Sequence, residues 1–251
     1  MRVISDIEYA AGLKMDLYRP DADGFDLIVW FHGGGLESGC RADGAGLGAA
    51  FAAHGCGFAS ADYRMYPAAR YPDYLLDGAR AVAFALQCAK EYGGSGRVIV
   101  SGQSAGAYMT MLLALNPALL RNAGASCAAV AAYISDSAQQ TTHFNVLRER
   151  GEDSRAERID PAAPLWSIGA ERLPAPLLLI AYRDDIPCRP EQNALLYRSI
   201  RRFHPDAPIE LVMLPGGHCA GSSRPAENGE YPSVTETLRF LHETIEQGTE
   251  E

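Results

Sequence analysis

A glycine-flanked serine between an apolar run and a helical pattern constrains this chain more than any other feature. Gly102-Gln103-Ser104-Ala105-Gly106 follows the run Arg97-Val98-Ile99-Val100 and leads into an apolar-periodic segment that begins at Tyr108. The pattern predicts a strand, a tight turn and a helix. Such a turn holds a serine hydroxyl above the edge of a sheet and close to a helix N-terminus. Ser104 is therefore the candidate nucleophile, and a serine of purely structural role in a glycine-rich turn is the alternative.

A second motif supports the nucleophile interpretation. The apolar run Leu27–Phe31 predicts a buried strand, and it leads directly into His32-Gly33-Gly34-Gly35. A loop without side chains lets its backbone N–H groups approach a ligand, and such groups can stabilise the oxyanion of an acyl-transfer reaction. We assign Gly34, Gly35 and Ala105 as the donors. Gly34 precedes Ser104 by 70 residues.

Together these motifs resemble those of α/β-hydrolase esterases and lipases. The chain is similar over nearly its whole length to the group that includes hormone-sensitive-lipase-like carboxylesterases, bacterial acetyl esterases and feruloyl/acetylxylan esterases. Met15-Asp16-Leu17-Tyr18-Arg19-Pro20 resembles the opening strand of that group, and Asp62-Tyr63-Arg64-Met65-Tyr66-Pro67 resembles its DYRLAP segment. The resemblance implies an α/β-hydrolase fold with a mostly parallel central sheet and helices on both faces.

The resemblance also implies that an acid and then a histidine follow the serine, each on a loop after a late strand. The apolar run Pro176–Tyr182 predicts the first such strand, and two adjacent aspartates, Asp184 and Asp185, follow it. The spacing to Pro187 and Gln192 in similar esterases favours Asp185, and Asp184 stays the alternative.

The predicted strand Glu210–Leu214 comes next, and the glycine-flanked His218 follows it. We therefore predict that His218 is the base.

Composition and pattern predict one globular domain over residues 1–251. The chain has 251 residues, of which 47% are hydrophobic, and short apolar runs alternate with helical patterns, as expected of βαβ units. The first 26 residues suffice for an edge hairpin but not for a helical cap. Residues 135–173 lack clear strand character, and we expect them to form a small lid-like insertion. The helical patterns cover Asp73–Tyr92, Ala105–Leu115, Gln192–Phe203 and Ser233–Gln247.

Four residues are candidates for substrate contact: His32, Gln103, Phe144 and Trp166. His32 belongs to the glycine loop, Gln103 is the variable residue of the serine motif, and the two aromatic residues lie in the insertion. Gln103 replaces the Asp common in many acetyl esterases that resemble hormone-sensitive lipase. This departure and the missing cap favour the feruloyl/acetylxylan relatives.

Charge and motif content exclude several function classes. The net charge of −9 and the lack of a basic run argue against a nucleic-acid partner. No apolar run is long enough to span a membrane, and the N-terminus lacks the apolar core of a signal peptide, so we expect a cytoplasmic protein. No metal-ligand or phosphate-binding motif is present, and the proposed chemistry needs no cofactor. A homo-oligomer stays an open option.

The sequence therefore predicts a serine carboxylesterase that hydrolyses short-chain acyl esters, foremost acetyl esters, of small molecules or oligosaccharides through an acyl-enzyme. A triad does not name its leaving group. A formamidase or amidase, for example one that hydrolyses N-formylkynurenine, is therefore the first alternative. A ligand-binding protein that has this fold but no catalytic activity is the second.

Overall fold

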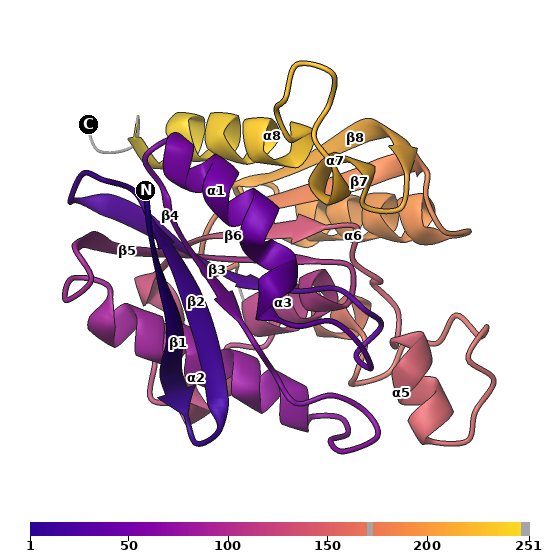
Figure 1. Cartoon of the computed structure of the whole chain (residues 1–251). Coiled ribbons are helices and arrows are strands. Elements are labelled where there is room, and N and C mark those ends of the chain that lie inside the picture. Colours follow the sequence, from indigo (N-terminus) through magenta and orange to yellow (C-terminus); the bar gives the residue numbers. More distant parts are fainter. Residues whose placement is uncertain (170–172, 247–251) are drawn as a thin grey trace.

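An eight-stranded sheet covered by helices on both faces organises the computed structural model, which describes residues 1–169 and 173–246 (Figure 1). The strands are β1 (Arg2–Ala10), β2 (Leu13–Arg19), β3 (Phe25–Phe31), β4 (Gly57–Ala61), β5 (Gly94–Gln103), β6 (Val130–Asp136), β7 (Leu177–Asp184) and β8 (Ile209–Gly217). The α-helices are α1 (Ala45–Ala53), α2 (Asp73–Cys88), α3 (Ala105–Leu115), α4 (Ala118–Asn122), α5 (Phe144–Glu149), α6 (Arg189–Phe203), α7 (Ala220–Ser223) and α8 (Pro232–Leu241). Shorter helical turns are η1 (Arg41–Gly44), η2 (Cys127–Ala129), η3 (Pro164–Ser167) and the π-helical η4 (His242–Glu246).

The strand order is β1-β2-β4-β3-β5-β6-β7-β8. Strand β2 pairs antiparallel with both β1 and β4, whereas every pair from β4–β3 to β7–β8 is parallel. The edge hairpin predicted for the first residues is thus formed by β1 and β2. The prediction of a mostly parallel sheet with helices on both faces is confirmed.

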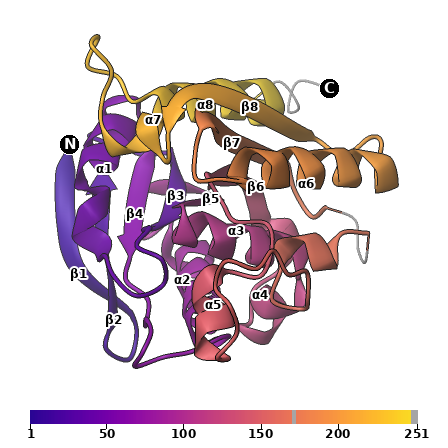
Figure 2. The same cartoon turned by 90° about the vertical axis from the view of Figure 1, so that its right-hand side faces the viewer.

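Alternate residues of the central strands build two cores, because successive side chains of a strand point to opposite faces. On β3, Ile28 and Trp30 join the core under α1 and α8, whereas Leu27, Val29 and Phe31 join the core under α2, α3 and α6. Figures 1 and 2 show α1 and α8 on one side of the sheet and α2 and α3 on the other. A strand buried on both faces reads as a continuous apolar run, which is why these strands were evident in the sequence.

The parallel strands end at one common edge of the sheet. His32 follows β3, Ser104 follows β5, Asp185 follows β7, and His218 follows β8. Loops at the carboxyl ends of parallel strands meet in space even when their residues are far apart in the chain. This edge therefore gathers the residues to which the sequence assigns chemistry.

Several element boundaries differ from the sequence predictions. Helix α2 ends at Cys88 instead of Tyr92, because the chain turns at Gly93, whose φ of +93° favours glycine, and β5 already begins at Gly94. Strand β7 continues through Asp184. Helix α8 ends at Leu241, and the predicted end of this helix, residue 247, lies outside the described residues.

The insertion after β6 packs against the body of the molecule. Residues 138–147 are almost all buried, and the short helix α5 is the one α-helix in the described part of residues 135–173. Glu149 of α5 accepts a hydrogen bond of 3.0 Å from the backbone N–H of Tyr71. Strand β6 extends to Asp136, so the insertion begins slightly later than the sequence indicates.

Candidate active site

The serine motif forms a strained turn between β5 and α3. Ser104 has φ +54° and ψ −112°, a conformation that non-glycine residues rarely adopt. The turn is tight enough to exclude side chains on both sides: a Cβ on Gly102 would lie 2.3 Å from the backbone of Gly106, and one on Gly106 would lie 2.0 Å from the carbonyl oxygen of Phe31. The flanking glycines are therefore required by close backbone approach.

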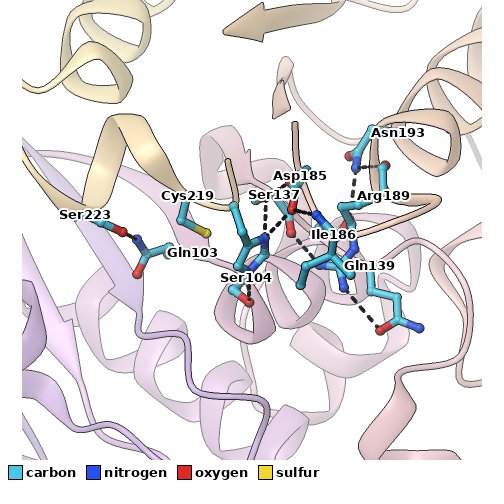
Figure 3. A network of polar contacts seen from close by, with 12 residues as sticks. Gln103, Ser104, Ser137, Gln139, Asp185, Ile186, Arg189, Asn193, Cys219 and Ser223 are labelled. Atoms are coloured by element: carbon cyan, nitrogen blue, oxygen red, sulfur yellow. Dashed lines mark hydrogen bonds and ion pairs between the residues drawn. The ribbon is translucent and has the colours of Figure 1, made fainter. Parts of the chain in front are cut away.

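Ser104, His218 and Asp185 form a chain of hydrogen bonds above this turn (Figure 3). The Ser104 hydroxyl lies 2.8 Å from Nε2 of His218, and Nδ1 of His218 lies 2.5 Å from Oδ1 of Asp185. With the imidazole proton on Nδ1, the serine donates to Nε2 and the imidazole donates to the carboxylate. Asp184 is the last residue of β7, and it is exposed. The register of β7 thus brings Asp185, and not Asp184, to the histidine.

The Asp185 side chain has no exposed surface and accepts three hydrogen bonds. Oδ1 also accepts from the backbone N–H of Ile186, at 2.6 Å, and Oδ2 accepts from the Ser137 hydroxyl. Burial acts to raise the pKa of this carboxyl, but the hydrogen bonds from His218 and Ser137 outweigh burial and hold the pKa below its ordinary value of 3.8. Asp185 is therefore ionised at neutral pH, as the orientation of an imidazole requires.

The glycine loop after β3 lies against the serine turn. A Cβ on Gly33 would lie 3.3 Å from Cβ of Ser104, and Gly34 and Gly35 both have positive φ angles, +100° and +66°. Within the described residues, the backbone N–H groups of Gly34 and Gly35 donate no hydrogen bond. Their carbonyl oxygens are held instead: Ser38 donates to Gly34, and Asn145 donates to Gly35. The N–H groups are thus available to a ligand at Ser104.

The sequence of this chain matches the model of a known protein family. The model of the BD-FAE family matches residues 15–148, more than half of the chain. The chain belongs to the BD-FAE family. Like the solved structures described below, it has the α/β-hydrolase fold.

Two curated relatives of this BD-FAE family member are plant proteins. It is 31% identical over 116 residues to the probable isoprenylcysteine alpha-carbonyl methylesterase ICMEL2 of Arabidopsis thaliana. The matched segment covers 45% of this chain and 28% of the relative. It is 35% identical over 109 residues to the probable isoprenylcysteine alpha-carbonyl methylesterase ICMEL1 of rice (Oryza sativa subsp. japonica), with coverage of 42% and 26%. The chain thus spans about a quarter of the length of these relatives.

Solved structures of esterase 2 from Thermogutta terrifontis share the fold of this BD-FAE family member. The structure phosphoramylated by tabun has a TM-score of 0.78 at 23% identity, over 96% of this chain and 94% of that one. The propionate-bound structure has a TM-score of 0.77 at 24% identity, over 96% and 93%. The similarity confirms the α/β-hydrolase fold.

Two of the four candidate substrate-contact residues, His32 and Gln103, hold loops of the candidate site in place. His32 is 1% exposed, stacks on Tyr63 with ring centres 4.2 Å apart, and donates from Nδ1 to the Gly33 carbonyl oxygen at 2.7 Å. Burial lowers the pKa of His32, so the ring is neutral. Gln103 donates from Nε2 to the Ser222 hydroxyl at 2.8 Å and to the Ser223 hydroxyl at 3.3 Å, which ties the serine turn to α7. Figure 3 shows Gln103 beside Ser223.

The other two candidates, both from the insertion, lie in different surroundings. Phe144 lines a cavity of 430 Å³ beside the loop that carries Asp185, together with Gln139 and Glu157 of the insertion and with Ile186, Arg189 and Gln192. Trp166 lies on η3 with 57% of its surface exposed, and it is absent from the lining of this cavity. The structure thus brings Phe144, but not Trp166, to the cavity next to the acid loop.

Sequence reasoning missed two groups at this site. Ser137 contacts both Asp185 and His218, and Arg189 donates a hydrogen bond of 2.7 Å to the Ser137 carbonyl oxygen. Neither residue belongs to a recognisable motif. Their contacts join residues 48 to 81 positions apart, and no local pattern in the chain records them.

No group of three or more His, Cys, Asp or Glu side chains in residues 1–169 and 173–246 is arranged to hold a metal ion. No helix within the same residues is both long and apolar enough to cross a bilayer.

Proposed function

We propose that this BD-FAE family esterase removes short acyl groups, acetyl foremost, from esters whose alcohol part is a carbohydrate, through an acyl-enzyme on Ser104. The observation that carries the proposal is the chain of hydrogen bonds from Ser104 through His218 to Asp185, next to a glycine loop with available N–H groups. Serine hydrolysis of esters needs this combination of nucleophile, oriented base and oxyanion donors.

The proposed reaction follows from these contacts. Nε2 of His218 takes the Ser104 proton while the serine oxygen attacks the ester carbonyl. The N–H groups of Gly34, Gly35 and Ala105 stabilise the oxyanion, and Asp185 stabilises the imidazolium. The imidazolium then protonates the departing alcohol oxygen as the carbon–oxygen bond breaks, which leaves the acyl group on Ser104. A water molecule, deprotonated by His218, then attacks the acyl carbon. The bond between this carbon and the Ser104 oxygen breaks, the imidazolium returns the proton to Ser104, and the acid is released.

The preference for a short acyl group rests on Phe144. Its ring lies so close to the glycine loop that a Cβ on Gly35 would be 2.9 Å from Cζ of Phe144. A ring in this place leaves little room for a long chain beside the oxyanion donors. The Thermogutta terrifontis esterase 2 has been solved with propionate and with butyrate bound, and these short acids support a short acyl site in this chain.

The preference for a carbohydrate alcohol rests on the cavity beside Asp185. The residues that line it include the aromatic Phe144 and four polar residues, Gln139, Gln192, Arg189 and Glu157. Planar polar side chains can donate to and accept from neighbouring hydroxyl groups, and the aromatic ring can pack on the apolar face of a sugar. A cavity of 430 Å³ has the size of a small-molecule site.

We also propose that residues 1–251 form one domain in which residues 135–173 act as a small lid over this cavity. Asn145 of this segment contacts Gly35 in the glycine loop, and Glu149 contacts Tyr71. These two contacts support a lid that is anchored beside the glycine loop.

The proposal is tested by hydrolysis of p-nitrophenyl esters from acetate to octanoate, with acetylated xylo-oligosaccharides and N-formylkynurenine in the same panel and Ser104→Ala as the control. We expect a preference for acetate and release of acetate from the sugars, both lost in Ser104→Ala. A preference for octanoate would contradict the short acyl site. Turnover of N-formylkynurenine without ester turnover would assign the chain to the amidases. Binding without turnover of any substrate would indicate a ligand-binding protein.

A further inference from the structure

Ser137 lies at the junction of the proposed acid and base, directly after β6 (Figure 3). Its hydroxyl contacts Oδ2 of Asp185 and lies 3.0 Å from Nδ1 of His218. The residue is completely buried, so no solvent competes for these contacts. Since an ionised carboxylate only accepts hydrogen bonds, the Ser137 hydroxyl donates to Asp185.

The backbone of Ser137 is held in an unusual conformation that aims this hydroxyl. Its φ angle is +65°, in the left-handed region that residues with a Cβ rarely adopt. Two hydrogen bonds keep it there: its N–H donates to the Ile180 carbonyl oxygen at 2.8 Å, and its carbonyl oxygen accepts from Arg189 at 2.7 Å. A non-glycine residue in this region indicates a local requirement that the surrounding structure enforces.

We propose that Ser137 is a positioning residue that orients the Asp185 carboxylate through its hydroxyl, so that Oδ1 faces Nδ1 of His218. This inference rests on the proposed function. A carboxylate can rotate about its Cβ–Cγ bond, and one hydrogen bond to each oxygen fixes that rotation. His218 and Ile186 hold Oδ1, and Ser137 is the side chain that holds Oδ2.

Several charged or titratable groups face the Asp185 carboxylate, but few of them contact it. The charged or titratable groups that face the carboxylate are His218 from the loop after β8, Arg189 from α6, Asp136 from β6 and Cys219 beside His218. Among the described residues, His218 is the one of these that contacts the carboxylate. Without Ser137, the hydrogen bonds that lower the pKa of Asp185 are fewer, and this pKa rises.

The test compares Ser137→Ala and Ser137→Gly with the wild type, using the preferred ester from the substrate panel. Alanine keeps the backbone strain and removes the hydroxyl, whereas glycine removes both, so the pair separates strain from hydrogen bonding. Ser135→Ala is the matched control, because Ser135 lies on β6 two residues before Ser137, is equally buried, and has a hydroxyl without a hydrogen-bond partner in the described residues. Ser104→Ala is measured beside them.

We expect both Ser137 variants to lose roughly 10-fold in kcat, the loss expected for a hydrogen bond to a charged group, with KM nearly unchanged. The acidic limb of the pH profile of kcat should move to higher pH, because the pKa of Asp185 rises when the Ser137 hydroxyl is removed. A purely structural role of Ser137 would not produce this change. Ser135→Ala should match the wild type.

Three results would overturn the inference. In the first, Ser104→Ala is inactive but both Ser137 variants keep wild-type kcat and pH profile, which leaves the proposed function intact. In the second, Ser137→Gly retains full activity and only Ser137→Ala loses it, which assigns the effect to strain. In the third, Ser104→Ala remains fully active, which overturns the proposed function as well.

Discussion

The side-chain amide of Asn145 in the insertion donates a hydrogen bond of 2.9 Å to the carbonyl oxygen of Gly35 in the glycine loop. Asn145 is completely buried, and Gly35 contributes one of the proposed oxyanion donors. Since the carbonyl oxygen of Gly35 is held from the insertion, a residue 110 positions away in the chain orients the Gly35–Leu36 peptide, which adjoins the peptide that carries the Gly35 N–H.

Asn145→Ala should therefore reduce both stability and turnover. Loss of a buried donor leaves the Gly35 carbonyl oxygen unpaired, which costs about 1–3 kcal/mol in the free energy of unfolding. The loosened loop should also lower kcat. We suggest thermal unfolding and steady-state kinetics, the latter well below the melting temperature, with Asn122→Ala on the exposed surface of α4 as the control. An unchanged kcat in a destabilised Asn145→Ala protein would show that this contact has no part in oxyanion stabilisation.

Ser104→Gly should abolish turnover and raise the melting temperature above that of Ser104→Ala. Both variants lack the nucleophile, but glycine adopts φ +54° without the strain that a Cβ imposes. Strain of this kind costs on the order of 1–3 kcal/mol. Calorimetry of the two variants measures the difference directly. Equal melting temperatures would mean that the turn is not strained.

Asp185→Asn should lower kcat by several orders of magnitude, because an amide at this position favours the wrong tautomer of His218. Asp184→Asn should stay within about 2-fold of the wild type, as expected for an exposed side chain outside the hydrogen-bond chain. Parallel kinetics of the two variants decide between the aspartates. The opposite ranking would transfer the acid role to Asp184.

Asp136→Asn should stabilise the protein at alkaline pH. Burial raises the pKa of Asp136 from 3.8 to about 6. The folded state therefore holds this proton more tightly than the unfolded chain, and stability falls as the pH rises from about 4 to above 6, by about 3 kcal/mol in total. An asparagine does not ionise and avoids this loss. Melting temperatures should differ most near pH 8 and converge below about pH 4. A difference that is independent of pH would rule out this explanation.

The parts of the site that the sequence predicts are those with a local signature. The serine turn and the glycine loop each follow one buried strand, and steric demands within a few residues, such as those at Gly102 and Gly106, dictate their composition. The fold class could be predicted for the same reason, because strands buried on both faces read as apolar runs between helical patterns. Spacing favoured Asp185 over Asp184 only weakly, since both aspartates follow the same run.

The sequence by itself determined the two motifs, the fold class and the positions at which nucleophile, acid and base are expected. The tertiary structure decided which aspartate faces His218 and which side chains support the site. The physical reason is that hydrogen bonds such as those of Ser137 to Asp185 and of Asn145 to Gly35 join residues 48 and 110 positions apart. These contacts exist only because parallel strands bring their carboxyl ends to one edge of the sheet.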